Sequence, residues 1–241
     1  MTVTSGPVVI GVGDEPYAGD AIALGGKLAE LLEAPVEHVT VPGHDPAAVL
    51  RETAAHDRAA MIVLGPGHHH LLRTLRGTAR HLLGGADCPV AVAPAGYAGG
   101  THAGLRRVGV GFEPTPAATR ALEFAYGLAA RAGGTLLVVG VALPLAPFAI
   151  DDLRDQTPYL DEERKTVERG LERELARLPL DVPRRAEARI GSPAGELADV
   201  SGELDLLVCG SHGRGPLRAA ALGSVTERLL RFSACPVVIV P

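Results

Sequence analysis

The residues whose types and spacing could do chemistry lie near the C-terminus, in the segment VCGSHGRGPLRAAALGSVTERLL at 208–230. Glycine lets a backbone approach an anion closely, and the free amides and dipole of a helix start favour negative charge. A serine hydroxyl and an arginine can add hydrogen bonds to phosphate oxygens. The segment is therefore a candidate phosphate-binding loop, with the key positions Gly210, Gly213, Arg214, Gly223 and Ser224.

Two readings without a ligand stay open for the same segment. Ser224 with Glu227 matches the Ser-x-x-Glu capping box, which closes a helix start by itself. The glycines could also serve only a tight turn, and the lysine of a P-loop is missing. His212 lies inside the loop and could contact a phosphate, but no nucleophile or orienting carboxylate accompanies it, so we assign no catalytic residue.

Other reactive side chains have simpler interpretations. Adjacent side chains in His68-His69-His70 diverge, and no Cys or carboxylate is spaced to complete a tetrahedral metal site, so a solvated loop is favoured over a metal site. The three cysteines, at 88, 209 and 235, sit in apolar runs and read as core residues of a reducing compartment. Cys209 is close enough to the candidate loop to leave redox sensitivity as an alternative.

The helices and strands that must position the loop are predicted from apolar runs and from the helix start and stop signals between them. In the second half, strands are expected at 106–112, 135–143, 185–190, 204–210 and 236–240, with helices at 116–132 and 224–232 and one that starts at Ser192-Pro193. An amphipathic surface helix is expected within 143–182. In the first half, strand-like runs near 7–13, 36–41, 60–65 and 89–93 alternate with helices over 19–33, 46–55 and near 78–83.

The chain repeats itself. GHDPAAVL at 43–50 resembles GSPAGEL at 191–197, and GTARHLLGGADCPVAVAP at 77–94 resembles GSVTERLLRFSACPVVIVP at 223–241, at offsets near 147. The cluster of small residues at 95–107 is the expected boundary. We therefore expect a shortened first repeat at 1–97, which lacks one strand and the amphipathic helix, and a complete second repeat at 104–241.

The alternation of strands and helices predicts the fold class. Crossovers of this length between continuous apolar strands indicate α/β domains with parallel, doubly wound, Rossmann-like sheets. In such sheets, ligands bind beyond the carboxyl ends of the strands. We further predict that 89–93 and 236–240 pair antiparallel, so that the two repeats form an intramolecular pseudo-dimer; a monomer and a further homodimer both stay open.

Bulk properties exclude several partners. The formal net charge is −5 and no basic run is present, which argues against nucleic acid. No uninterrupted apolar stretch reaches the ~20 residues of a membrane span. The first residues have neither a basic n-region nor a cleavable apolar segment, so we expect a cytoplasmic protein.

The loop pattern resembles that of a known family. Gly210-Ser-His-Gly213, nine residues, then Gly223-Ser224 is similar to the G-x2-G-x9-G-[S/T] signature of ATP-binding universal stress proteins, and 234–240 is similar to their closing strand. The resemblance implies tandem five-stranded domains of the adenine-nucleotide α-hydrolase type and an adenine nucleotide in the second repeat. It implies ATP, with ADP or AMP as alternatives and with or without Mg²⁺. By position it implies the ligand contacts Val110, Gly111, Val141, Gly210, His212, Gly213, Arg214, Gly223, Ser224, Val225 and Thr226.

This sequence departs from that family pattern in three places. Gly111 stands where family members carry an Asp after the first strand, and Gly13 holds the same place in repeat one. In repeat one, His68 replaces the second loop glycine and the interval from Gly65 to Gly77 is one residue short, so we expect that loop to be degenerate. The first repeat also lacks the long helix, which predicts an incomplete pocket wall.

Three functional hypotheses follow. The first is an ATP-binding regulatory protein of the stress response that changes shape or protein partner on binding, with at most slow hydrolysis. The second is a pseudo-dimeric scaffold that has lost nucleotide binding, which the missing Asp favours. The third is an enzyme that transfers a nucleotidyl or phosphate group, for which no substrate-side group can be named.

Overall fold

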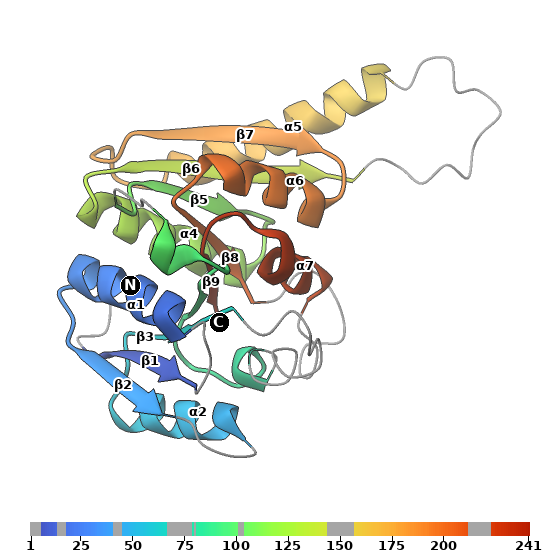
Figure 1. The fold of residues 1–241 in the computed structure, drawn as a ribbon. Coiled ribbons are helices and arrows are strands. Elements are labelled where there is room, and N and C mark those ends of the chain that lie inside the picture. The colour runs from blue at the N-terminus through green and yellow to red at the C-terminus, as the bar shows by residue number, and fades with distance from the viewer. Residues whose placement is uncertain are drawn as a thin grey trace.

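The two repeats share one β-sheet. The structure is a computed structural model that describes residues 6–13, 18–40, 45–66, 79, 81–100, 104–143, 157–211 and 223–241. Within these residues the strands form a nine-stranded sheet in the order β2-β1-β3-β4-β9-β8-β5-β6-β7. In Figure 1 the sheet runs from β2 at the bottom to β7 at the top.

The first repeat supplies four of these strands. Its elements are β1 (Val8–Val12), α1 (Ala18–Leu32), β2 (Val36–Thr40), α2 (Pro46–His56), β3 (Met61–Leu64) and β4 (Val90–Val92). Residues 81–83 are also helical, as expected. All pairings inside this repeat are parallel. The expected loss of one strand and one long helix is confirmed for the described residues.

The second repeat is complete. Its elements are β5 (Arg107–Gly111), α4 (Pro116–Arg131), β6 (Thr135–Ala142), α5 (Thr157–Leu175), β7 (Arg184–Ile190), α6 (Pro193–Val200), the 3₁₀ turn η2 (Ser201–Glu203), β8 (Leu206–Gly210), α7 (Ser224–Phe232) and β9 (Val237–Val240). Its five strands are parallel to one another. The α/β fold class is therefore as predicted.

The repeats join through their last strands. β4 pairs antiparallel with β9, with Val90 opposite Ile239 and Val92 opposite Val237. All seven residues of these two strands are buried. The predicted pseudo-dimeric pairing is confirmed, and the carboxyl ends of β5 and β8 consequently lie at the same edge of the sheet as the amino ends of β3 and β4.

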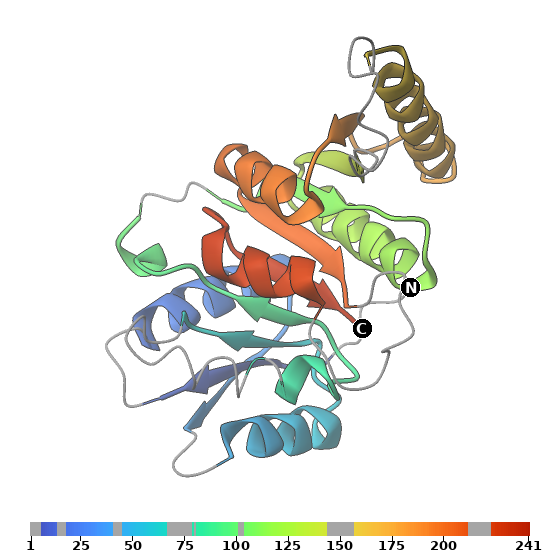
Figure 2. The same ribbon diagram turned by 90° about the vertical axis from the view of Figure 1, so that its right-hand side faces the viewer.

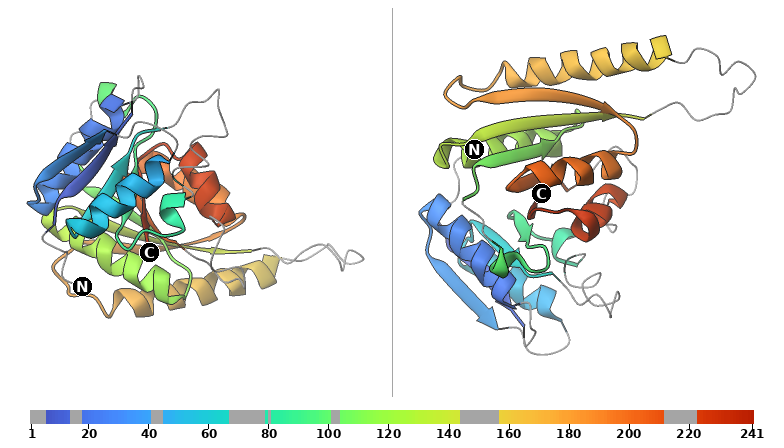
Figure 3. Two further views of the ribbon diagram at one scale, coloured as in Figure 1. Left: turned by 90° about the horizontal axis from the view of Figure 1, so that it is seen from below. Right: turned by 45° about the horizontal axis from the view of Figure 1, so that its top comes forward.

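Helices cover both faces of the sheet. Side chains of α1, α4 and α5 pack into one large core cluster, whereas α2 packs on the other face of repeat one and α6 with α7 on the other face of repeat two. Figure 2 shows α4 and the pair α6 and α7 on opposite sides of the second-repeat strands. Figure 3 shows α6 and α7 side by side.

In the part of repeat one that the structure describes, there is no counterpart of α5, and the edge strand β2 carries polar side chains instead. Aligning Ile10-Gly11-Val12-Gly13 with Val108-Gly109-Val110-Gly111 makes His38 and Thr40 the counterparts of Leu136 and Val138. Leu136 and Val138 are at most 1% exposed in the core cluster that α5 joins, whereas His38 and Thr40 are exposed. Polar side chains at these positions let the edge of the shortened sheet face water without a covering helix.

The linker between the repeats is fastened to repeat one. The carboxylate of Asp20, only 4% exposed on α1, accepts hydrogen bonds from the backbone amides of Gly96 (2.9 Å) and Ala98 (2.7 Å). The two carboxylate oxygens thus satisfy the amide of Ala98 in the short 3₁₀ turn η1 (Tyr97–Gly99) and that of Gly96, which is its N-cap. The side chain of Tyr97 is buried in the core. Residues 96–98 of the linker are thus packed against repeat one.

Candidate functional site

Three of the expected site residues come together at one edge of the second-repeat sheet. β8, β5 and β6 are neighbours in the sheet, and Gly111 lies opposite Cys209 on β8 and Val139 on β6. Gly210 is the last residue of β8, and Val141 is one residue before the end of β6. Because ligands of doubly wound sheets bind beyond the carboxyl ends of the strands, this edge is the candidate site.

The two expected residues of β5 face opposite sides of the sheet. The side chain of Val110 is fully buried in the cluster beneath α4, so only its backbone is available to a ligand. Gly111 faces α6, where an added Cβ would lie 2.8 Å from Cδ1 of Leu197 and 3.2 Å from Sγ of Cys209. The space beside Gly111, the position at which the family resemblance implies an Asp, is therefore filled by the packing of Leu197.

Gly210 has a packing role of its own. A Cβ on this residue would lie 2.8 Å from the carbonyl carbon of Ala117 and 3.0 Å from the amide nitrogen of Ala118. Glycine thus lets the first turn of α4 press against the end of β8. That turn is capped by Thr115, whose hydroxyl accepts a hydrogen bond from the Ala118 amide (3.2 Å). This first loop glycine has a structural reason to be present whether or not a ligand binds.

The start of α7 corrects the capping-box interpretation. The N-cap residue is Gly223, Ser224 is the first helical residue, and the N-cap residue makes no side-chain hydrogen bond to the described residues of this end. The side chain of Ser224 is exposed, that of Val225 is half-buried, and Thr226 is 4% exposed. Since the first-turn amides of a helix lack intrahelical acceptors, this end offers N–H donors beside an exposed hydroxyl. Ser192 is likewise the N-cap of α6, but its side chain makes no capping bond.

The remaining expected residues lie outside the described part of the chain. These are His212, Gly213 and Arg214 of the second-repeat loop, and Gly67 to Gly77 of the first-repeat loop. The described ends of the second loop are Ser211, whose amide donates to the carbonyl of Val240 (2.8 Å), and Gly223. The roles of His212, Gly213 and Arg214 therefore stay predictions from the sequence pattern.

The cysteine nearest the site is a core thiol. Cys209 is 6% exposed, and burial raises the pKa of its thiol to about 12. Burial also raises the pKa of Cys235 to about 12. The reactive thiolate is the minor form of both at neutral pH, so these residues behave as small hydrophobes. Among the described residues, no group of three or more His, Cys, Asp and Glu side chains is arranged to hold a metal ion.

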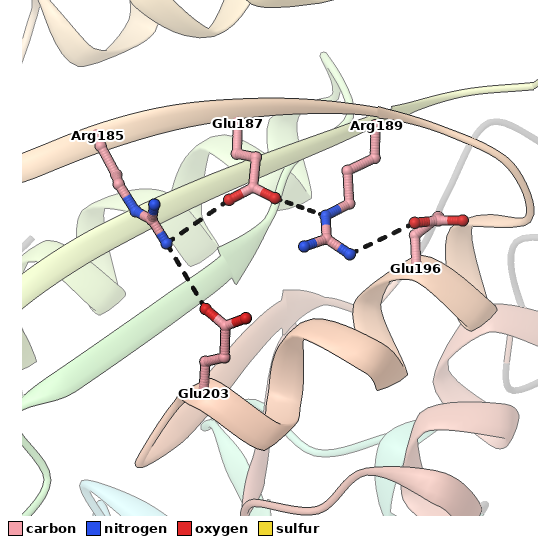
Figure 4. A network of polar contacts seen from close by, with 5 residues as sticks. All are labelled: Arg185, Glu187, Arg189, Glu196 and Glu203. Atoms are coloured by element: carbon pink, nitrogen blue, oxygen red, sulfur yellow. Dashed lines mark hydrogen bonds and ion pairs between the residues drawn. The ribbon is translucent and has the colours of Figure 1, made fainter.

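A charged network beside the site was not foreseen from the sequence. In Figure 4, Arg189 on β7 lies between two carboxylates, with Nε 2.6 Å from Glu187 and Nη1 3.5 Å from Glu196 on α6. Arg185 continues the chain of contacts to Glu187 (3.6 Å) and to Glu203 (3.8 Å). Since Arg189 pairs with Val141 in the sheet register, the network anchors α6 along the outer wall of the candidate site.

The comparison with family models decides the family. The model of the universal stress protein family matches twice, at residues 7–94 and 104–241. The chain belongs to the universal stress protein family. Both halves of this universal stress protein are therefore family domains in tandem, which fits the antiparallel pairing of their last strands.

Curated relatives are longer than this chain. A universal stress protein of Mycobacterium tuberculosis is 32% identical over 185 residues, which cover 76% of this chain and 62% of that protein. A universal stress protein of Mycolicibacterium smegmatis is also 32% identical, over 189 residues with the same coverage. This chain thus spans less than two thirds of the length of the curated relatives that it matches.

Solved structures agree on the fold. The crystal structure of a universal stress protein from Archaeoglobus fulgidus matches with a TM-score of 0.57 and 20% identity, over 97% of this chain and 87% of that one. A putative universal stress protein from Pseudomonas aeruginosa matches with a TM-score of 0.62 and 15% identity, over 99% and 84% of the two chains. In the described ranges, none of the helices has the length and apolar character needed to cross a membrane.

Proposed function

We propose that this universal stress protein binds an adenine nucleotide in its second repeat and regulates a partner according to occupancy. The observation that carries the proposal is the start of α7, where Gly223 leaves the helix end without a side-chain cap and Ser224 presents its hydroxyl to solvent. Phosphate is the ligand that such an end favours, because the free amides and the helix dipole both attract negative charge.

The order of the strands supports one placement of the ligand. The phosphates would lie between the first turn of α7 and the loop that leaves β8 at Gly210, with the adenosine toward Gly111 and Val141. His212, Gly213 and Arg214 complete the loop pattern in the sequence. ATP is the proposed nucleotide, with ADP and AMP as alternatives that share the adenosine and part of the phosphate chain.

The proposed role is regulatory. The described site residues are glycines, valines, a serine and a threonine, which can bind and orient a nucleotide but do not make a nucleophile and base pair. Binding can still act on a partner, because a ligand that prefers one conformation shifts the population toward it. The outer wall of the site, α6 with its contacts to β7, is one element that such a shift could move.

A second candidate function is favoured by the packing of Gly111. Leu197 fills the space beside Gly111, and the carboxylate that the family resemblance implies there, which would accept a hydrogen bond from the nucleoside, is absent. A net hydrogen bond contributes about 0.5–1.5 kcal/mol. If the remaining contacts are too weak without it, the molecule is a pseudo-dimeric scaffold that binds protein partners without nucleotide.

Thermal unfolding with and without ATP separates the two candidates. At ATP concentrations of 100 times Kd, one site adds about 2.7 kcal/mol to the unfolding free energy. We expect a clear rise in Tm for the unmodified chain, no rise for Gly213→Leu, and an unchanged rise for the matched Gly67→Leu variant in the first-repeat loop. A Tm that does not respond to millimolar ATP would favour the scaffold, and loss of the response in Gly67→Leu alone would move the site to repeat one.

A further inference from the structure

A cavity lies where the two repeats meet. It has a volume of about 670 Å³ and is bounded by the end of α2, the residues that precede β3 and β4, and the middle of α4. Small-molecule sites in proteins occupy about 300–1,000 Å³ and often lie at domain interfaces. The cavity shares no lining residue with the candidate nucleotide site, although both lie at the same edge of the sheet.

Small side chains keep this space open. Much of the wall is alanine from repeat one, including Ala54 and Ala55 on α2 and Ala59 and Ala60 before β3. From repeat two, Phe124 contributes an aromatic ring, and Gly127 has no heavy atom within 4 Å of where its Cβ would be. The walls therefore suit an apolar body that can lie against the ring of Phe124.

The charges around the cavity are mainly acidic. Glu52, Asp87 and Glu123 contribute three carboxylates, and within the described residues no hydrogen bond or ion pair engages any of them. Two guanidinium groups, those of Arg51 and Arg58, also line the cavity, and that of Arg51 donates a hydrogen bond to the carbonyl of His81 (3.4 Å).

The pKa of the Cys88 thiol is affected by one of these carboxylates. Burial, and after it the negative charge of the neighbouring Asp87, raise its pKa to about 11. Cys88 also lines the cavity. The three carboxylates of the lining outnumber its two guanidinium groups, so with the apolar wall they favour a ligand that carries a positive charge on an apolar body.

We infer that the cavity between α2, β3 and α4 is a second ligand site, which takes an aromatic or similarly flat apolar molecule bearing a primary amine. The apolar body lies against the alanines and Phe124, and the ammonium group pairs with the free carboxylates of Glu123 and Asp87. Charge-assisted hydrogen bonds of this kind are shorter and stronger than neutral ones. The inference does not depend on nucleotide binding in the second repeat.

Two probes with the same body and opposite charge test the inference. We expect 2-naphthylmethylamine to bind the full chain in isothermal titration calorimetry, and 2-naphthoate to bind at least about tenfold more weakly, a difference of about 1.4 kcal/mol. Equal or stronger binding of the naphthoate would overturn the assigned ligand class. The absence of measurable heat for both probes at millimolar concentration would overturn the site.

Variants locate the binding. Gly127→Phe places a ring into the cavity from a position with free space, and it should abolish binding of the amine without loss of Tm, because glycine is a poor helix residue. Gly170→Phe is the matched control, since Gly170 on α5 also has free space around its Cβ and lies outside the cavity. Glu123→Gln should weaken binding of the amine about fivefold and leave binding of the naphthoate unchanged. Amine binding that persists in Gly127→Phe would contradict the placement.

Discussion

Leu197 on α6 packs directly against Gly111 at the carboxyl end of β5, so that a Cβ on Gly111 would lie 2.8 Å from the Cδ1 atom of Leu197. This contact joins the wall of the candidate site to the strand on which the family resemblance implies an Asp. It explains in physical terms why glycine stands there: the aliphatic side chain of α6 has taken the space. The two positions are coupled, and their substitutions should not be additive.

The first prediction concerns this pair. Gly111→Asp should lower the unfolding free energy by about 1–3 kcal/mol, because the new side chain forces Leu197 to move. Combined with Leu197→Ala, the carboxylate gains room, so the double variant should be more stable than the sum of the single effects and should bind ATP more tightly than the unmodified chain. Urea unfolding and calorimetry measure both. Gly26→Asp, where nothing lies within 4 Å of the added Cβ, is the control, and strict additivity would show that the pair is independent.

The second prediction separates a ligand role of Ser224 from a capping role. Because the hydroxyl makes no capping bond, Ser224→Ala should change the unfolding free energy by less than about 0.5 kcal/mol. The same change should weaken ATP binding about fivefold, because one hydrogen bond to phosphate is lost. Asp45→Ala is the counterpart with a real cap, since Asp45 accepts a hydrogen bond from the Ala48 amide (3.1 Å), and it should cost about 1 kcal/mol. A large stability loss in Ser224→Ala would restore the capping interpretation.

The third prediction concerns the linker. Asp20→Ala removes the acceptor for the amides of Gly96 and Ala98, and it should lower the unfolding free energy by about 2–4 kcal/mol because buried groups lose a charged partner. Hydrogen exchange of those two amides should accelerate. Asp20→Asn retains one acceptor oxygen, so its unfolding free energy should lie between those of the unmodified chain and of Asp20→Ala. Unchanged exchange in Asp20→Ala would mean that the linker is held by other contacts.

The fourth prediction is a pH dependence. Burial alone would raise the pKa of Asp205, but the guanidinium and backbone amide of Arg107 and the amide of Arg106 hold it below the ordinary value of 3.8. A carboxyl whose folded pKa is lowered stabilises the fold above its unfolded pKa and loses that contribution as pH falls through the folded value. Denaturant unfolding from pH 6 to pH 2 should therefore show a loss below about pH 4 that is smaller in Asp205→Asn. Asp161→Asn, in an exposed pair with Arg164, should leave the profile unchanged.

The fold was largely predictable from the sequence. Buried strands read as continuous apolar runs, and the internal repeat supplied the topology, including the antiparallel pairing of Val90–Val92 with Val237–Val240. Helix bounds were close because Pro116 and Pro193 mark helix starts and Gly133-Gly134 follows a helix end. These signals are local in the chain, and so they can be read one segment at a time.

The site was predictable only in part. Gly111, Val141 and Gly210 were expected at one edge and lie there, but the fit of Leu197 against Gly111 depends on the contact of two elements far apart in sequence. The network of Arg189 with Glu187 and Glu196 escaped notice because the charges look like ordinary surface residues along a strand and a helix. The capping pattern at Ser224 misled because the helix begins one residue earlier than the motif requires.

The most direct test of nucleotide binding in the second repeat is a titration of the ¹⁵N-labelled chain with ATP, followed by two-dimensional NMR. The amides of Gly111, Val141, Gly223, Ser224 and Val225 should shift with a common Kd, while those of Val12 and Leu64 in repeat one stay in place. Shifts confined to repeat one, or no shift at any of these amides at millimolar ATP, would contradict the account.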